Sequence, residues 1–325
     1  MSVVVVNFTV VTFCCRRCCR RHRRCRWIVF IPCLRWSFSF APISTACVDR
    51  VCNKKMVAGT DGNIISRNKI KAPDVDWDTM QKDSTAMDCL IPMGVTSENV
   101  VEAYGLQRRT LDEFSARSHQ KAAAAQQRGA FRDEIIPVGS VMDDDGIRPT
   151  TTAHVLATLQ PVFKEHGVTT AGNSSQMTDG AAAVLLMTRA QAEQRGLPVL
   201  GVWRGFAVKG VPPHIMGIGP AVAIPAVLEQ AGMELKDIDV FEINEAFASQ
   251  ATWCVDELGI DYAKVNPNGG AIALGHPLGC TGARQIATLL HEMNRTKKRF
   301  GIISMCIGTG MGAAAILEVE PRSSL

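Results

Sequence analysis

Hydrophobic positions in the last third of the chain fall into short blocks with two different periods. Continuous apolar runs predict buried strands, whereas apolar residues spaced three and four apart predict helices. The blocks are strands at 200–208, 238–243, 301–306 and 313–319, and helices at 220–231, 245–258 and 281–293. Strands that alternate with helices indicate an α/β sheet covered by helices. The last two strands are joined by the glycine turn GTGMG, which predicts an antiparallel pair at one edge of the sheet.

The middle of the chain carries weaker signals of the same kind. A polar stretch at 56–92 with little periodicity is typical of a linker. A short helix is predicted to end at Gly105, and Thr110 with Glu113 forms a capping box that predicts the start of a longer helix. The remaining predictions are a helix stop at Gly129, a short strand at 135–138, a strand at 181–187 and a helix at 190–195.

The first 48 residues have a composition unlike the rest of the chain. They contain eight Arg, no Lys and no acidic residue, and eight of the twelve Cys lie before residue 53. Without those eight Arg, 27 basic residues face 31 acidic ones, so the net charge of +4 conceals a mildly acidic body. The apolar runs at 3–13 and 27–34 are far shorter than the roughly 20 residues of a membrane helix, so we predict no membrane span.

The Arg/Cys cluster at 14–26 raises two further possibilities. Cys14, Cys15, Cys18 and Cys19 suggest zinc, but no second ligand pair follows at finger spacing, and we predict no metal site. A run of Arg is usually a solvated or targeting segment, so we predict no nucleic-acid partner. The scattered cysteines of the body indicate a reducing compartment.

Three polar positions stand at the ends of predicted elements, where α/β sheets bind their ligands. Asn244 follows a strand, His276 lies in a glycine-rich loop before a helix, and Cys306 ends a strand. A His and a Cys brought together there could share a proton, and the nearby glycines let backbone N–H groups approach an oxyanion. Each residue also has a structural interpretation, as a loop histidine, a small core thiol or a helix-capping asparagine. The residues alone therefore predict a Cys/His site without naming its substrate.

Six separated motifs resemble those of the thiolase family and follow the family order. Three lie in the carboxyl half: NEAFA at 244–248, NPNGGAIALGHPLGCTGAR at 266–284 and MCIGTGMGAA at 305–314. Three lie upstream: DCLIPMGVTSENV at 88–100, SARSHQKAAAAQQRGAF at 115–131 and GNSSQMTDGAAAVLLM at 172–187. The resemblance runs from about residue 88 to 320, and the motifs look most like those of peroxisomal-type 3-ketoacyl-CoA thiolases.

The resemblance implies a layered α-β-α-β-α sandwich of two similar halves, with a loop domain inserted in the first half. It implies an acyltransferase that cleaves 3-ketoacyl-CoA with free CoA, giving acyl-CoA and acetyl-CoA, or runs the reverse condensation, in fatty-acid β-oxidation. CoA is then a substrate, and no bound cofactor is expected. His276 matches the residue that activates a nucleophilic cysteine and helps bind the thioester oxygen. Cys306 matches the acid/base that moves the substrate proton.

The resemblance also implies narrower roles for other positions. Asn244 matches the asparagine that fixes a water in one oxyanion hole, and Gly308 matches the glycine whose N–H serves the other. Met93 and Met216 match methionines that line the pantetheine channel. Ser175 matches a serine near the pantetheine of CoA.

The nucleophile motif is the least similar part. The family pattern resembles VNRVCSSGLQA, and the nearest segment here, VDRVCNKKMVA at 48–58, places Cys52 at the nucleophile. Lys54 and Lys55 replace small residues and are costly to bury, although a neighbouring lysine can also lower a thiol pKa. Residues 1–47 do not resemble the strands and helices that the family places there. The alternative is a catalytically impaired thiolase-like protein that binds acyl-CoA or a partner chain.

These patterns divide the chain into three segments. We expect a divergent Arg/Cys-rich, disordered extension at 1–55, a remnant of the amino-terminal half with its loop domain at 56–195, and the carboxyl-terminal domain at 196–325. The first half-domain is expected to be incomplete and the carboxyl half complete; a complete first half would form a homodimer or homotetramer. The tripeptide at 323–325 loosely resembles a peroxisomal signal, so we expect a peroxisomal location, with the mitochondrion, suggested by the Arg run, as the alternative.

Overall fold

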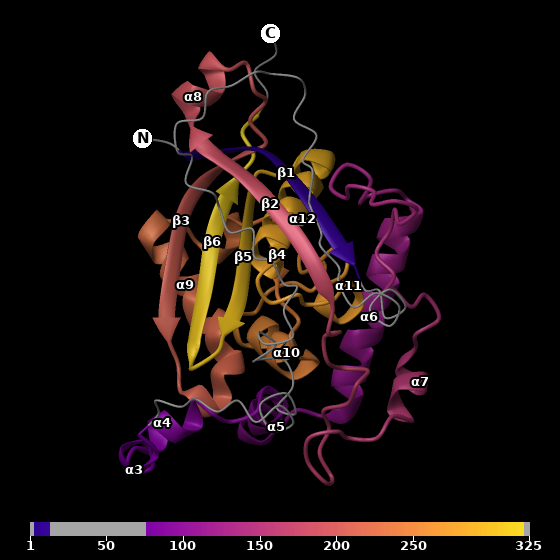
Figure 1. Cartoon of the computed structure of the whole chain (residues 1–325), viewed down its shortest axis with the longest axis vertical. Coiled ribbons are helices and arrows are strands. Elements are labelled where there is room, and N and C mark those ends of the chain that lie inside the picture. The colour runs from indigo at the N-terminus through magenta and orange to yellow at the C-terminus, as the bar shows by residue number, and fades with distance from the viewer. Residues whose placement is uncertain (1–2, 14–75, 322–325) are drawn as a thin grey trace.

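The centre of the molecule is a six-stranded mixed sheet in a computed structural model that describes residues 3–13 and 76–321 (Figure 1). The strands are β1 Val3–Phe13, β2 Asp179–Thr188, β3 Gly201–Gly210, β4 Val240–Ile243, β5 Phe300–Ile307 and β6 Met311–Glu318. Their order across the sheet is β2-β1-β3-β6-β5-β4. Strands β4 and β5 run parallel, and the other neighbouring pairs of this sheet run antiparallel. The predicted α/β class is confirmed.

Helices lie on both sides of this sheet. The α-helices of the described residues are α3 Trp77–Met80, α4 Ser84–Asp88, α5 Met93–Tyr104, α6 Arg108–Gln127, α7 Ala153–Ala157, α8 Arg189–Gln194, α9 Gly219–Ala231, α10 Ala248–Glu257, α11 Ala271–Leu274 and α12 Thr281–Thr296. Two 3-10 turns, η1 Pro213–Ile218 and η2 Leu235–Asp237, flank α9.

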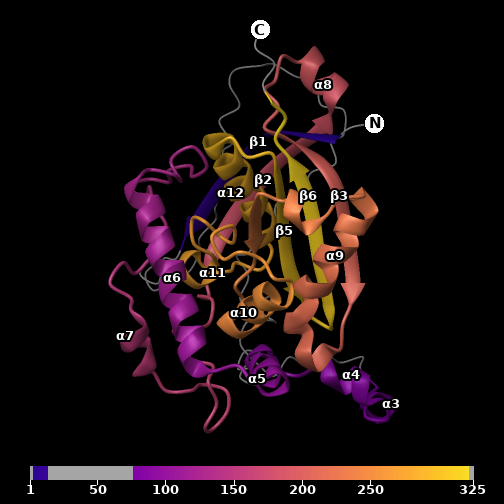
Figure 2. The same ribbon diagram turned by 180° about the vertical axis from the view of Figure 1, so that it is seen from behind.

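Alternating side chains of β6 build two separate cores. Ile316 packs with Ile224 of α9 in one cluster, and Leu317 packs with Leu290 of α12 in another. Successive residues of a strand point to opposite faces, so α9 and α12 cover opposite faces of β3–β6–β5–β4. Figure 2 shows α9 in front of the sheet and α12 behind it.

Strands β1 and β2 form a ribbon that leaves the sheet and crosses α12 (Figure 1). Strand β1 pairs with β2 along its whole length but with β3 only at Val4 and Val5. Val5 and Val184 of the ribbon join the core cluster of α12. The described residues therefore provide a helix, a sheet, a helix and a strand ribbon in succession, which are four of the five layers predicted.

Strand β1 corrects one prediction for the amino-terminal segment. The sequence placed Val3–Phe13 in a disordered extension, whereas these residues form a strand, and Val4 and Val5 are fully buried. The run is rich in β-branched residues, which fit a pleated, buried surface, so its composition was a strand signal. The rest of the predicted extension, including the Cys14–Cys19 cluster, lies outside the described residues.

Three local predictions are also wrong. The antiparallel pair β5–β6 lies inside the sheet and not at its edge, because β3 pairs with the other side of β6. Thr110 and Glu113 do not cap α6, which begins at Arg108, and Glu113 instead pairs with Arg109. The segment at 135–138 forms no regular strand, although Val138 makes an isolated bridge with Val141.

The upstream helices pack against the carboxyl half and enclose the site. Val101 of α5 and Leu111 of α6 share a buried cluster with Ala251 of α10 and Ile272 of α11. Figure 2 shows α5 and α6 beside α10 and α11. The carboxyl ends of β4 and β5 open toward this junction, because the two strands are parallel and Asn244 N–H donates to Ser304 O at 2.9 Å.

Candidate active site

A cavity of about 260 Å³ lies at the junction of α5, η1, α10 and the end of β5. It brings together six residues that the sequence predicted for the site: Met93, Ser175, Met216, His276, Cys306 and Gly308. These residues come from five separate stretches of the chain, so only the fold brings them together. The remaining lining residues are Thr96, Ser97, Gly217, Ala246, Phe247, Gln250 and Leu278.

His276 is held by contacts at its backbone and at both ring nitrogens. Its N–H donates to Gln176 O at 3.1 Å. Its Nδ1 lies 2.6 Å from Thr281 Oγ1, and its Nε2 lies 3.3 Å from Asn244 Nδ2. The preceding Gly275 has φ +93°, and a Cβ there would lie 2.3 Å from the Thr178 hydroxyl, so this turn requires glycine.

These contacts define one tautomer of the histidine. The Thr281 hydroxyl donates to Pro277 O at 3.0 Å, which leaves its oxygen to accept a proton from His276 Nδ1. With Nδ1 protonated, His276 Nε2 carries the lone pair and accepts from Asn244 Nδ2. Burial, and to a lesser extent the charge of Arg284, lowers the pKa of His276 to about 4. The ring is therefore neutral at pH 7 and carries its lone pair on Nε2.

Cys306 stands at the end of β5, where the strand enters a turn. Its side chain is half-buried and lines the cavity, which distinguishes it from a thiol that only fills the core. Burial raises the pKa of this thiol to about 11, although its own backbone N–H has the opposite effect. The thiol is therefore protonated at neutral pH. Gly308, two residues further on, also lines the cavity.

Asn244 lies directly behind His276 rather than in the cavity wall. It is buried, and its Oδ1 has no hydrogen-bond partner among the residues described. The alternative that Asn244 caps the next helix is wrong, because α10 begins at Ala248 with Phe247 in the N-cap position. Its Nδ2 contacts His276, and its Oδ1 is available to accept a hydrogen bond from another group.

Glu245, beside Asn244, links the glycine-rich motif at 266–284 to helix α6. Its carboxylate accepts from Ser118 Oγ at 2.6 Å, from Asn266 Nδ2 at 2.7 Å and from the Ile272 N–H at 3.2 Å. Gly270 contacts this carboxylate so closely that a Cβ would lie 2.2 Å from Glu245 Cδ. The NEAFA motif therefore fixes the start of the loop that carries His276.

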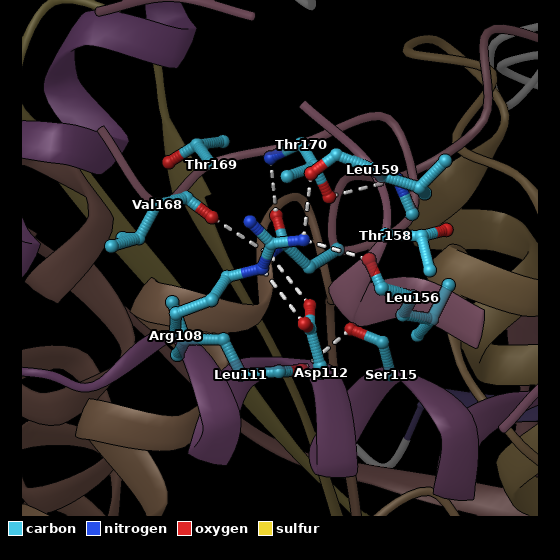
Figure 3. A network of polar contacts seen from close by, with 12 residues as sticks. Arg108, Leu111, Asp112, Ser115, Leu156, Thr158, Leu159, Val168, Thr169 and Thr170 are labelled. Carbon is cyan, nitrogen blue, oxygen red and sulfur yellow. Dashed lines mark hydrogen bonds and ion pairs between the residues drawn. The ribbon is translucent and has the colours of Figure 1, made fainter. Parts of the chain in front are cut away.

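A polar network around Arg108 and Asp112 joins α6 to the loop that leads to Ser175, and Figure 3 shows its centre. The Arg108 guanidinium donates to Asp112 at 2.7 Å, and Asp112 accepts from Asn173 Nδ2 at 3.2 Å. The backbone then runs beside the NEAFA segment, where Ser175 N–H donates to Ala246 O at 2.9 Å. This loop is therefore attached on one side to α6 and on the other to the cavity wall.

Two residues of the cavity wall, Thr96 and Ser97, were not predicted for the site, although their spacing from Met93 could have indicated them. Thr96 and Ser97 follow Met93 by three and four residues, which places them on the same face of α5. Gln250 follows Ala246 by four residues, but nothing in its sequence context marks it as a residue of the cavity wall. Cys52, the predicted nucleophile, lies outside the described residues.

The structure can be searched for a metal site and for a membrane-spanning helix only within the residues that it describes. Within residues 3–13 and 76–321, no three His, Cys, Asp or Glu side chains are arranged to hold a metal ion. Over the same residues, no helix combines the length and apolar character needed to cross a bilayer.

The layered fold and the cavity with His276 and Cys306 define a class of protein, and the chain belongs to the thiolase family. The family model "Thiolase, N-terminal domain" matches residues 41–190, which include Cys52, and "Thiolase, C-terminal domain" matches residues 197–319. Among individual relatives, "3-ketoacyl-CoA thiolase B, peroxisomal" of Rattus norvegicus is 58% identical over 274 residues, covering 80% of this chain and 62% of the relative. The human "3-ketoacyl-CoA thiolase, peroxisomal" is 57% identical with the same coverage.

Solved structures give the same assignment. The dimeric peroxisomal thiolase of Saccharomyces cerevisiae is 55% identical, with a TM-score of 0.72 over 76% of this chain and 63% of that chain. The human mitochondrial 3-ketoacyl-CoA thiolase in complex with CoA is 40% identical, with a TM-score of 0.71 over 72% of this chain and 60% of that chain. The chain spans about three fifths of the length of the relatives that it matches.

Proposed function

We propose that this chain carries out thiolase chemistry, the CoA-dependent cleavage of 3-ketoacyl-CoA to acyl-CoA and acetyl-CoA, or the reverse condensation. The observation that carries the proposal is the single cavity that contains His276, Cys306 and Gly308 together with Met93, Met216 and Ser175. His276 and Cys306, which could transfer protons, thus line the same cavity as the residues that the family resemblance assigns to the pantetheine channel. The names of the relatives support the substrate class.

In the first half of the reaction, Cys52 attacks the 3-keto carbon and gives its proton to His276 Nε2. The C2–C3 bond then breaks, the acyl group stays on the Cys52 sulfur, and the electron pair moves to C2 of the departing acetyl-CoA. Cys306 donates its proton to C2, which suits a thiol whose pKa of about 11 keeps it protonated at rest.

In the second half, the Cys306 thiolate takes the proton from the incoming CoA thiol. The CoA sulfur attacks the acyl group, and the Cys52 sulfur leaves and recovers its proton from His276. Because the pKa of His276 is lowered to about 4, a proton held there returns readily to the departing thiolate. Both side chains are restored at the end of the cycle.

Charge develops on carbonyl oxygens in both halves, and the site offers donors for it. The N–H of Gly308 is proposed for the oxygen of the Cys52-bound group, and His276 with a water on Asn244 for the enolate oxygen of acetyl-CoA. The unpartnered Oδ1 of Asn244 supports a bound water there. One preplaced donor of this kind is worth about 10²–10³ in rate in acyl transfer.

The proposal extends to pathway, compartment and assembly. The relatives are named as peroxisomal 3-ketoacyl-CoA thiolases, which favours fatty-acid β-oxidation in the peroxisome for this chain. A solved relative is a dimeric thiolase, which favours self-association through the first half-domain. Sedimentation of the purified chain over a range of concentrations would measure that association.

The decisive experiment is thiolysis of acetoacetyl-CoA by the full chain in the presence of CoA. We expect CoA-dependent loss of substrate in the wild type, its loss in His276→Ala and Cys306→Ala, and a covalent acetyl group on Cys52 detected by mass spectrometry. No turnover and no acetyl-enzyme in the wild type would overturn the proposal.

A binding protein without catalysis is the second candidate, and Asn53, Lys54 and Lys55 beside Cys52 favour it. Calorimetric titration with CoA and acetyl-CoA separates the two. Binding without an acyl-enzyme would establish the second function, and turnover would exclude it.

A further inference from the structure

Helix α11 is a single turn that ends directly before His276, and its last two carbonyls that need donors cannot find them within the helix. The chain leaves the helix at Gly275, whose φ of +93° and ψ of 165° do not continue it. The helical partner of Ile272 O would be the His276 N–H, which is turned away from the helix. The partner of Ala273 O would be Pro277, which has no N–H. Both carbonyls therefore need donors from another segment of the chain.

The side chain of Gln176 supplies these donors. Its Nε2 lies 3.0 Å from Ile272 O, 3.1 Å from Ala273 O and 2.8 Å from Gly146 O. Carbonyl oxygens can only accept, so the atom that faces them is the amide nitrogen, whose two protons serve three acceptors. The loop at Gly146 packs directly on this amide, because a Cβ there would lie 2.9 Å from Gln176 Oε1.

The backbone of Gln176 holds the other side of the same turn. The His276 N–H donates to Gln176 O at 3.1 Å, and the Thr178 hydroxyl donates to the same oxygen at 3.1 Å. Gln176 is itself attached to the body, because the preceding Ser175 N–H donates to Ala246 O at 2.9 Å. One residue thus bonds to the backbone on both sides of Gly275, the residue at which the chain turns into His276.

We infer that Gln176 is a positioning residue, whose amide holds the last carbonyls of α11 and thereby fixes the direction in which the His276 ring enters the cavity. The inference rests on the proposed function, in which His276 Nε2 exchanges a proton with Cys52. Gln176 does not line the cavity and acts only through the backbone that carries His276. A displacement of a reacting group by about 1 Å can cost about 10²-fold in rate, so the turn before this histidine has to be held in place.

Two substitutions of Gln176 test the amide. Gln176→Met keeps the length of the side chain and removes both polar atoms. Gln176→Asn keeps the amide but is shorter by one methylene group, so the nitrogen no longer reaches all three carbonyls; it provides the test if the methionine variant does not fold. Asn294→Leu is the matched control, because Asn294 Nδ2 also donates to two backbone carbonyls, Leu290 O at 2.8 Å and Leu200 O at 3.0 Å, but near the end of α12 that is remote from His276.

Nitrogen NMR of the imidazole ring between pH 5 and 7.5 follows His276 in each protein, with His276→Ala identifying its signals, and thermal unfolding records stability. The wild-type ring should stay neutral over this range, because burial and then the charge of Arg284 lower its pKa to about 4. We expect Gln176→Met and Gln176→Asn to admit water to the ring and to raise its pKa by about one or more toward the ordinary value of about 6.5. Asn294→Leu should leave the ring signals unchanged, even if it lowers the midpoint of thermal unfolding as much.

Thiolysis of acetoacetyl-CoA gives the second measurement. Gln176→Met should lower kcat about tenfold or more with KM changed less than about threefold, and Asn294→Leu should keep both values. Ring signals that are the same in wild type and both Gln176 variants would overturn the inference, as would an equal shift in Asn294→Leu or an unchanged kcat in an active chain. A wild type without turnover would refute the proposed function, whereas the ring signals would still decide whether Gln176 positions His276.

Discussion

At the scale of single residues, the site depends on how the two nitrogens of His276 are distinguished. Thr281 is buried, and its hydroxyl is already committed to Pro277 O, so it can serve Nδ1 only as an acceptor. That arrangement keeps the lone pair on Nε2, next to Asn244. Thr281 thus acts through the histidine and is a positioning residue.

We predict that Thr281→Val releases this constraint, because the isosteric methyl group cannot accept from Nδ1. Nitrogen NMR of the His276 ring should show the Nδ1–H tautomer in the wild type and a mixture of tautomers in the variant. If the chain is active, kcat should fall about tenfold or more with little change in KM, and Thr281→Ser should restore it. Identical ring spectra for wild type and Thr281→Val would contradict the assignment.

The sequence revealed this site unevenly. His276, Cys306 and Gly308 stand at element ends in recognisable motifs, and the cavity contains all three. Gln250 and Thr281 carry no such mark, because a glutamine or a threonine in the first turn of a helix is common anywhere. Their roles arise from contacts with Ala246 and His276, and such contacts become visible only when the chain is folded.

At the scale of elements, periodicity predicted the carboxyl half closely. Strands β3, β5 and β6 and helices α9 and α12 begin and end within a few residues of their predicted bounds. The order of the strands could not be predicted in the same way, because the pattern of apolar residues within a strand does not say which strand lies beside it. Strand β6 lies between β3 and β5, and α9 packs across it with Gly219 of the helix against Gly312 of the strand.

We predict that Gly312→Ala separates α9 from β6. A Cβ at Gly312 would lie 2.1 Å from Gly219 O, and a backbone atom at the start of a packed helix cannot move aside cheaply. The expected cost is about 2–3 kcal/mol of unfolding free energy, measured in urea. Because Gly312 pairs with Cys306 in the sheet, CoA binding should weaken as well.

Gly210→Ala is the control for this substitution, since no atom lies within 4 Å of a Cβ at that strand end. Its unfolding free energy should change by less than about 0.5 kcal/mol. If Gly312→Ala and Gly210→Ala lowered the unfolding free energy equally, the loss would come from replacing a strand glycine and not from the close contact between α9 and β6.

At the scale of the whole molecule, α12 is buried between the sheet and the ribbon of β1 and β2. The resemblance implied a helix layer between two β layers, but the sequence could not predict that β1 takes part, because residues 1–47 do not resemble the family and the apolar run at 3–13 had no evident partner. Val5 is fully buried in the α12 cluster, while Val3 is 39% exposed on the same strand. Substitutions at Val5 and Val3 therefore test whether the ribbon of β1 and β2 covers α12.

We predict that Val5→Asp destabilises the chain by about 3 kcal/mol, because it places a carboxylate against Leu289 and Leu290 without a partner. Val3→Asp should cost less than about 1 kcal/mol. Urea unfolding measures both. If Val5→Asp were as mild as Val3→Asp, the ribbon would not cover α12 in solution.

The connection between the upstream helices and the layered body includes a buried acid. Glu134 follows α6, is 4% exposed, and accepts from Thr288 Oγ1 of α12 at 3.0 Å. Burial raises the pKa of Glu134 to about 8, against the smaller opposite effects of Thr288 and Arg284. The folded chain thus binds this proton more tightly than the unfolded chain, whose glutamates titrate near their ordinary pKa of about 4.3. The resulting stability is complete below that value and is lost as pH rises through about 8.

We therefore predict that Glu134→Gln, which keeps an oxygen for Thr288, stabilises the chain more as pH rises. Urea unfolding should give nearly equal free energies for the two proteins at pH 5 and the largest advantage for the variant at pH 9. Glu113→Gln on the exposed side of α6 is the control for removing a charge from the same region. The buried Glu242, whose pKa is raised to about 7, remains in both proteins, and its charge contributes to the raised pKa of Glu134 that the comparison measures. An advantage of Glu134→Gln that stays constant from pH 5 to 9 would mean that Glu134 carries the same charge in the folded and unfolded chain, and that the junction with α12 is open to water.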